Sequence, residues 1–157
     1  MSKNVVVALE DAHSPEAARL LDAMCAELSA RYHRPPSLFV LEEVLVVARS
    51  DGDPVGCGAL RQINKTTVEV KRMYVVPTAR RRGVARQVLA ELERVASERG
   101  NNKVILETGV FQPEALALYG SAGYRRTANY GRYVGNPEAC CFEKDVEPGP
   151  GERGSVR

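Results

Sequence analysis

Several features that mark other classes of protein are missing from this sequence of 157 residues. No apolar run approaches the ~20 residues that a membrane-spanning helix requires. The net charge of +2 is too small to indicate nucleic-acid binding from the overall field. The N-terminal residues lack the long apolar region and cleavage site of a signal peptide. We therefore expect a cytoplasmic protein without nucleic-acid or membrane partners.

Cysteine and histidine are too few and too scattered to indicate a metal site. The two histidines, His13 and His33, complete no ligand pattern with the cysteines. The cysteines form no Cys-x-x-Cys pair; they are Cys25, Cys57, Cys140 and Cys141. We expect free thiols in a reducing compartment, and no bound metal.

The remaining composition is that of a globular domain with a substantial core. Hydrophobic residues make up 44% of the chain and charged residues 27%. The length predicts one domain, which we place at residues 1–146. Residues 147–157 are rich in proline, glycine and charge and predict a flexible tail. The chain contains no internal repeat.

The most informative stretch is a strand, a short basic turn and a helix. Residues 68–76 are rich in β-branched and aromatic side chains and stop at Pro77, which is typical of a strand end. After Gly83, apolar side chains recur at helical spacing as far as Ala96, and Gly100 follows as a helix stop. The turn therefore leads into the N-terminus of a long amphipathic helix.

This turn has the chemistry of an anion site. The first turn of a helix carries unpaired N–H groups and partial positive charge. Arg80, Arg81 and Arg82 add formal charge, and Gly83 allows close approach of a ligand. The glycine spacing fits neither an NTP-binding loop nor a dinucleotide fold. We predict a phosphate or pyrophosphate site; a plain basic turn or a DNA-backbone contact are the alternatives.

The rest of the chain alternates between short strands and helices. Asp11 or Ser14 caps a helix that has Pro15 in its first turn and ends near His33. The strand at 104–108 should run parallel to the strand at 68–76, because a helix connects them. The other predicted elements are strands at 4–9, 44–48 and 55–63, a hairpin turn at 50–53, a helix at 113–122, and a closing strand pair at 124–127 and 139–146.

Two motifs in this order resemble the GCN5-related N-acetyltransferases, the GNAT family. Residues 80–85 match the family's Arg/Gln-x-x-Gly-x-Gly/Ala loop, and residues 112–124 match a second family motif. The resemblance covers roughly residues 44–144, as in small bacterial members of the family. It implies an α/β (α+β type) fold with a mixed, mostly antiparallel sheet, splayed at the cofactor cleft and flanked by helices. It also implies two helices and a connecting loop before residue 44, with that loop lining the acceptor pocket.

The resemblance implies that acetyl-CoA is the cofactor and assigns residues to its parts. The backbone amide of Met73 would face the thioester oxygen, and the backbone of Val75 would bond the pantetheine arm. Gln112 stands where relatives carry an asparagine that contacts the cofactor. The pyrophosphate would be held mainly by backbone N–H groups, in the loop of Arg80, Arg81, Arg82, Gly83, Val84 and Ala85.

Two side chains are candidates for proton transfer. Glu69 matches the glutamate that many family members use as general base; a salt-bridged carboxylate beside Lys71 or Arg72 is the alternative. Tyr119 matches the tyrosine proposed to protonate the departing thiolate, and an aromatic core residue is the alternative. A phenol with a pKa near ~10 still carries its proton at neutral pH.

The acceptor side is less defined by motif. Tyr130, Arg132 and Tyr133 lie between the last two strands and have the chemistry to bind a carboxylate or a flat apolar group. An ordinary aromatic-rich turn is the alternative. Arg61 and His33 are further candidates for the pocket lining.

We predict an acetyl-CoA-dependent N-acetyltransferase that acts on an amine by direct attack in a ternary complex. A small-molecule acceptor is favoured over a protein. The resemblance also implies a possible homodimer, since dimers are common among relatives. Cys57 and Cys140 lack a histidine partner, which disfavours an acetyl-cysteine route. The alternatives are a non-catalytic CoA-binding sensor or interaction module, and an acyltransferase that uses another acyl-CoA.

Overall fold

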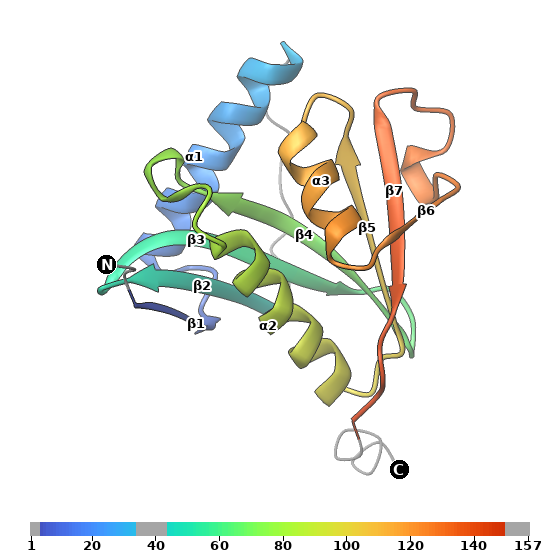
Figure 1. The fold of residues 1–157 in the computed structure, drawn as a ribbon, viewed down its shortest axis with the longest axis horizontal. Coiled ribbons are helices and arrows are strands. Elements are labelled where there is room, and N and C mark those ends of the chain that lie inside the picture. The colour runs from blue at the N-terminus through green and yellow to red at the C-terminus, as the bar shows by residue number, and fades with distance from the viewer. Residues whose placement is uncertain (1–3, 34–43, 150–157) are drawn as a thin grey trace. The chain divides into compact units, whose positions relative to one another are not determined.

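The structure is a computed structural model that describes residues 4–33 and 44–149. Its helices and strands follow in the order β1 (Val5–Glu10), α1 (Pro15–Tyr32), β2 (Val44–Ser50), β3 (Asp53–Gln62), β4 (Thr67–Val75), α2 (Val84–Glu98), β5 (Lys103–Gly109), α3 (Pro113–Ser121), β6 (Arg125–Thr127) and β7 (Ala139–Asp145) (Figure 1). Two short 3-10 helices, η1 (Pro77–Ala79) and η2 (Gly131–Tyr133), follow β4 and β6. Each predicted strand and helix is confirmed within a few residues.

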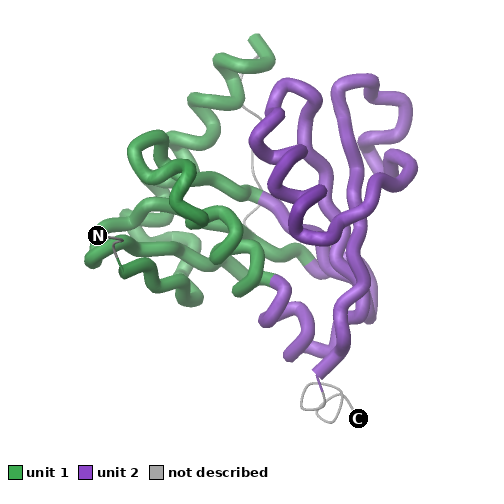
Figure 2. Tube along the Cα trace, viewed as in Figure 1, with its two compact units in different colours: residues 1–61, 72–92 green, residues 62–71, 93–157 purple. Residues whose placement is uncertain are grey.

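The strands form a mixed sheet in the order β1-β2-β3-β4-β5-β7-β6. Neighbours β1–β2, β2–β3, β5–β7 and β6–β7 are antiparallel, whereas β4 and β5 are parallel as predicted. The chain divides into two compact units, residues 1–61 with 72–92 and residues 62–71 with 93–157 (Figure 2). Unit 1 and unit 2 each contain part of β4 and part of α2.

In unit 1, helices pack on both sides of β3. Cys57 and Ala59 belong to the core cluster that buries Leu20 and Met24 of α1. Gly58 points the other way, because successive strand residues face opposite sides. A Cβ on Gly58 would lie 2.8 Å from side-chain atoms of Met73, Val88 and Leu92. The bare glycine therefore allows α2 to approach β3 closely.

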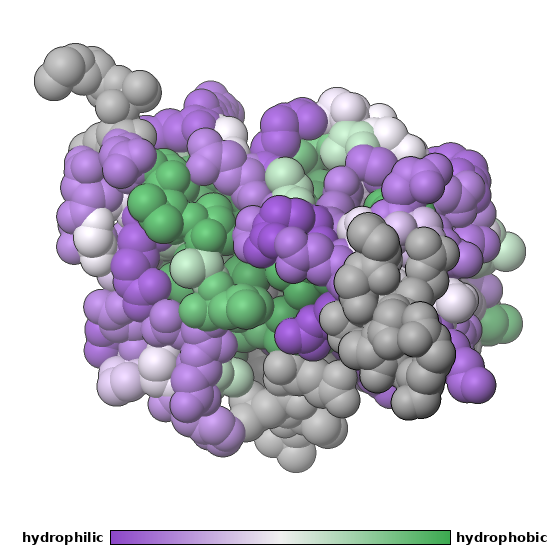
Figure 3. All heavy atoms as spheres, turned by 90° about the horizontal axis from the view of Figure 1, so that it is seen from below, coloured by the Kyte–Doolittle hydropathy of each residue, from purple (hydrophilic) through white to green (hydrophobic). Residues whose placement is uncertain are grey.

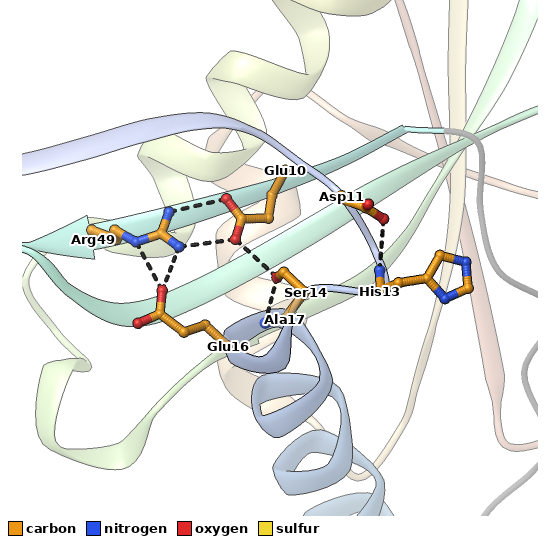
Figure 4. A network of polar contacts seen from close by, with 7 residues as sticks. All are labelled: Glu10, Asp11, His13, Ser14, Glu16, Ala17 and Arg49. Carbon is orange, nitrogen blue, oxygen red and sulfur yellow. Dashed lines mark hydrogen bonds and ion pairs between the residues drawn. The ribbon is translucent and has the colours of Figure 1, made fainter.

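A polar network fixes the start of α1 (Figure 4). The Ser14 hydroxyl accepts from the Ala17 N–H at 3.1 Å and donates to Glu10 at 2.9 Å. The Arg49 guanidinium then bridges Glu10 at 2.9 Å and Glu16 at 2.5 Å. Ser14 is thus the cap, out of the two predicted candidates, and the network ties β1, β2 and α1 together.

One expectation about this region is only partly covered by the described residues. The family resemblance implied two helices with a connecting loop before residue 44; residues 4–33 contain one helix, Pro15–Tyr32, and residues 34–43 lie outside the described residues. His33 ends it in a left-handed conformation with φ 55°. The acceptor-lining loop expected after it lies outside the described residues. The hairpin between β2 and β3 is as predicted, with φ of 51° at Asp51 and 90° at Gly52.

In unit 2, the core is apolar and aromatic. Val68 and Val70 of β4 pair with Val104 and Leu106 of β5, and all four are buried. The start of the predicted tail is not detached from this unit. The Gly149 N–H donates to the Ser97 carbonyl at 2.6 Å, and the Ser97 hydroxyl donates to the Glu147 carbonyl.

The thiols and one apolar patch are the remaining features of the part of the chain that the structure describes. The four cysteines are free, and three of them are buried. Apolar side chains gather into a patch on one face of the molecule, with hydrophilic side chains at its border (Figure 3). None of the helices in residues 4–33 and 44–149 is long and apolar enough to cross a bilayer.

Candidate functional site

The loop from β4 to α2 turns sharply through two left-handed residues. Arg81 has φ 66° and Gly83 has φ 80°. A Cβ placed on Gly83 would meet no atom within 4 Å, so the space beside this backbone is open. A positive φ is easy for glycine but strained for arginine, so the loop holds Arg81 in a costly conformation. Such local strain is common where backbone geometry serves a ligand.

Helix α2 begins directly after this turn. Its first hydrogen bond runs from the Gln87 N–H to the Gly83 carbonyl at 3.0 Å. Helix geometry therefore leaves the N–H groups of Val84 and Ala85, in the first turn, without partners inside the helix. Arg81 and Arg82 are exposed beside them. The N–H groups of a helix N-terminus, the helix dipole, two cations and open space together have the chemistry that an anion site requires, and the predicted site stays a prediction.

Arg80 behaves differently from its two neighbours. Its Nε donates to the Val75 carbonyl at 2.8 Å, and its Nη2 bonds Glu27 of α1 at 2.7 Å. Its guanidinium also lies over the Tyr74 ring, 5.6 Å from the centroid. Arg80 therefore braces the loop against α1 and β4. The sequence gives no signal for Glu27, which is 53 positions away.

Strand β4 is interrupted before it reaches the loop. Arg72 has φ 58°, which departs from the extended backbone of the strand predicted for residues 68–76 and is the kind of local irregularity that a β-bulge produces. The paired residues of the β4–β5 ladder run from Thr67 to Val70, although β4 continues to Val75. The Met73 side chain packs over Gly58. Any contact of Met73 with a thioester would therefore involve its backbone, and that role stays a prediction.

In unit 2, Glu69 is joined to the segment between β6 and β7. Glu69 is only 3% exposed. The Tyr130 hydroxyl donates to its Oε2 at 2.7 Å, and the Lys71 ammonium lies 3.9 Å from its Oε1. The structure thus brings together two of the predicted site residues, which are 61 positions apart in the sequence.

Tyr133 and Arg132 extend this cluster. The rings of Tyr130 and Tyr133 meet edge to face, with centroids 5.5 Å apart. Arg132 lies over the Tyr133 ring at 5.2 Å and donates to its hydroxyl at 3.3 Å. Burial raises the pKa of Tyr130, and the hydrogen bond to the Glu69 carboxylate raises it further. The phenol therefore stays protonated and acts as a donor to Glu69.

Tyr119 and Gln112 lie on α3. Tyr119 is 4% exposed and packs against the rings of Tyr124 and Phe142, at centroid distances of 5.8 and 6.1 Å. Burial raises the pKa of Tyr119, and the charge of Glu107 adds to the shift. Gln112 caps the helix through its backbone carbonyl, which accepts from Ala115 and Leu116. The roles predicted for Tyr119 and Gln112 stay predictions.

His33 and Arg61, the two further candidates for the acceptor pocket, are both exposed. His33 is the residue that ends α1, and Arg61 lies near the end of β3. Their predicted roles rest on the sequence.

Comparison with known sequences identifies the family. The sequence profile of the Acetyltransferase (GNAT) family matches residues 8–124. An IAA acetyltransferase from Azospirillum brasilense is 39% identical over 102 residues, which cover 64% of this chain and 67% of that protein. YsnE from Bacillus subtilis (strain 168), an uncharacterized N-acetyltransferase, is 35% identical over 100 residues, covering 61% of this chain and 66% of that protein. The matches thus span about two thirds of these relatives.

Comparison with solved structures agrees with the comparison with known sequences. A protein from Klebsiella pneumoniae subsp. pneumoniae MGH 78578, described as an acyl-CoA N-acyltransferase, has a TM-score of 0.80 at 28% identity, covering 90% of this chain and 97% of that chain. A GNAT acetyltransferase from Elizabethkingia anophelis with acetyl-CoA bound has a TM-score of 0.70 at 17% identity, covering 92% and 100%, and so shares the fold. With a family profile that spans most of its length, the chain belongs to the GNAT family of acetyltransferases.

Proposed function

We propose that this chain is an N-acetyltransferase that transfers the acetyl group of acetyl-CoA to an amine of a small molecule. The observation that carries the proposal is the loop at Arg81–Gly83, which joins two left-handed residues, open space and the first turn of α2. The residues fit a pyrophosphate, because the donors are backbone N–H groups and the neighbouring side chains are cations. Relatives named acetyltransferase, one with acetyl-CoA bound, support the cosubstrate.

Within this proposal, the loop and β4 hold and orient the cosubstrate. The N–H groups of Arg81 to Ala85 would bind the pyrophosphate, with Arg81 and Arg82 adding charge. Arg80 would act mainly through the loop, because its Nε already bonds the Val75 carbonyl. The backbone amides of Met73 and Val75 would contact the acyl-pantetheine arm. The bound thioester supplies an acetyl carbonyl carbon that an amine can attack, with release of CoA as a thiol.

The transfer requires one group that accepts a proton and one that donates a proton. The acceptor arrives as an ammonium and must lose a proton before it has a lone pair. Glu69 is the proposed base, because its carboxylate is buried and is fixed by a 2.7 Å hydrogen bond. Tyr119 is the proposed donor to the leaving sulfur. Its raised pKa keeps it protonated at neutral pH, although it makes the phenol a weaker acid than tyrosine in water.

The proposed acceptor is a small amine. The segment Tyr130–Tyr133 is packed on itself by an edge-to-face ring pair and an arginine over a ring. Two aromatic rings beside a carboxylate suit a compact, partly apolar ammonium compound. Relatives named for IAA also support a small molecule. A cytoplasmic location completes the proposal and agrees with the free thiols.

The test is calorimetric titration with acetyl-CoA, CoA and ATP, followed by a thiol-release assay. The assay uses a pool of primary amines that includes tyramine, 2-phenylethylamine, spermidine and amino-acid methyl esters. We expect binding of acetyl-CoA and CoA but not ATP, and thiol release that depends on the amine. Binding without thiol release from any amine would favour a non-catalytic CoA-binding module. Equal binding of ATP would contradict the assignment of the loop.

A further inference from the structure

The carboxylate of Glu69 lies where water has little access, since the residue is only 3% exposed. A buried carboxylate is costly unless donors and cations surround it. The Lys71 ammonium is 3.9 Å from Oε1, a distance for attraction rather than a short hydrogen bond. The Tyr130 hydroxyl is 2.7 Å from Oε2, within the range of strong charge-assisted bonds. Tyr130 therefore contributes directly to the orientation of Glu69.

Tyr130 is itself held by its surroundings. It directly precedes η2, and its ring meets the Tyr133 ring at an interplanar angle of 89°. The Asn129 amide ties the segment together by donating to the carbonyls of Tyr133 and Asn136, both at 3.1 Å. A phenol fixed in this way can orient a partner, because it has little freedom to turn away.

We infer that Tyr130 is a positioning residue for the transfer reaction: its hydroxyl holds the Glu69 carboxylate oriented to receive the proton of the acceptor ammonium. The inference rests on the proposed function, which makes Glu69 the base. In the step concerned, one N–H bond of the ammonium breaks and one O–H bond forms on Glu69. The products are a neutral amine and a carboxylic acid. Tyr130 keeps its own proton throughout.

The Glu69 carboxylate and the Tyr130 phenol have other charged and titratable neighbours. Lys71, Arg132 and Tyr133 interact with Glu69, and Tyr133 and Cys141 interact with Tyr130. Glu107 of β5 acts on Arg132 and Tyr133. Replacing Tyr130 by phenylalanine leaves all of them in place. A change in the pH profile of that variant therefore reports the lost hydroxyl.

The chain offers a matched control. The Tyr124 hydroxyl also donates to a glutamate, Glu93, also at 2.7 Å and also within unit 2. Tyr130→Phe and Tyr124→Phe therefore remove the same group from the same kind of pair. We expect Tyr130→Phe to lower kcat/KM for the most active amine of the pool by roughly tenfold, with the affinity for acetyl-CoA unchanged. Tyr124→Phe should change kcat/KM by less than about twofold.

The pH profile separates positioning from packing. Activity falls at low pH as the base takes up a proton, and a carboxylate that has lost a donor takes it up more readily. The acidic limb should therefore move to higher pH in Tyr130→Phe and stay in place in Tyr124→Phe. In a Glu69→Gln background, adding Tyr130→Phe should cost nothing further. An unmoved limb, or full additivity of the two substitutions, would overturn the inference.

A measurement without turnover distinguishes this failure from failure of the proposed function. The tyrosine ring carbon that bears the hydroxyl is followed by NMR on labelled protein as the pH is lowered. The Tyr130 signal should step with the protonation of Glu69 and should be flat in Glu69→Gln. If the step is absent, the pairing is wrong. If the step is present but the wild-type protein releases no thiol with any amine, the proposed function fails, and the role of Tyr130 in transfer fails with it.

Discussion

The loop before α2, in unit 1, and the segment between β6 and β7, in unit 2, are built in different ways. The loop relies on its backbone, with two positive φ angles and the open first turn of a helix. The segment relies on side chains, in the contacts of Tyr130 with Glu69 and of Arg132 with Tyr133. A backbone site shows in the sequence as glycine at a fixed position. A site built from side chains shows only when the chain is folded, because its partners are far apart in sequence.

The strongest test of this difference is to place a side chain and a negative charge on the backbone of the loop before α2. Gly83→Glu should lower the affinity for acetyl-CoA by roughly 1000-fold, since like charges brought together cost several kcal/mol. Calorimetry gives the affinity. Gly52→Glu is the matched control, because Gly52 also has a positive φ and open space around its Cβ position. A folded Gly83→Glu variant that binds as well as Gly52→Glu would contradict the backbone site.

The next test concerns the proposed proton donor. Tyr119→Phe keeps the ring contacts with Tyr124 and Phe142 but removes the hydroxyl. We expect kcat to fall by roughly 100-fold, as for loss of a general acid, while acetyl-CoA affinity changes by less than about twofold. Steady-state kinetics and calorimetry measure the two quantities. Equal losses in both would show that Tyr119 serves packing rather than proton transfer.

The three arginines of the loop sharpen the comparison further. Arg80→Ala should lower acetyl-CoA affinity by roughly tenfold, because the variant loses the brace to Val75 and Glu27 as well as a charge. Arg81→Ala should cost only about two- to threefold, and less at high salt, because an exposed charge is screened. Calorimetry at two salt concentrations measures both. Similar losses for the two variants would mean that side-chain charge, rather than the loop backbone, dominates binding.

The smallest expected effect concerns the free energy of unfolding and its dependence on pH. Hydrogen bonds from Arg49 and from Ser14 lower the pKa of Glu10. This stabilisation is present above the ordinary pKa of a glutamate and is lost as the pH falls through the lowered value. Arg49→Met should therefore reduce the free energy of unfolding by about 1 kcal/mol at neutral pH, and by less in acid. Denaturant titrations at two pH values test this; an equal loss at both would contradict the role of the ion pair.

Much of the fold follows from local sequence. Ser14 before Pro15, the Asp51–Gly52 turn and Gly100 after α2 each mark an element boundary, because each meets a specific backbone requirement. The place of β7 between β5 and β6 was not predicted. A signal was present in the sequence: β7 begins with four apolar residues, which the structure buries, whereas β6 is a short strand with two exposed arginines, as suits an edge.

The candidate site likewise has features that the sequence predicts and features that only the folded chain shows. The glycine and the arginines identified the loop, and the second motif identified α3. The brace between Arg80 and Glu27 and the pair of Tyr130 and Glu69 join residues 53 and 61 positions apart. No spacing rule connects positions so distant, because their contact depends on how strands and helices pack. The sequence could name Glu69 and Tyr130 as candidates without predicting their hydrogen bond.

The burial of the cysteines has a practical consequence for the chemistry of detection. Burial raises the pKa of Cys57 to about 12 and raises the pKa values of Cys25 and Cys141 as well. Only a thiolate attacks a disulfide reagent rapidly, so these residues react slowly at neutral pH. An aromatic disulfide reagent added during turnover should therefore develop colour by reaction with the released CoA. The protein's own thiols should add little background colour. A continuous optical record of each acetyl transfer then needs no cysteine-free variant.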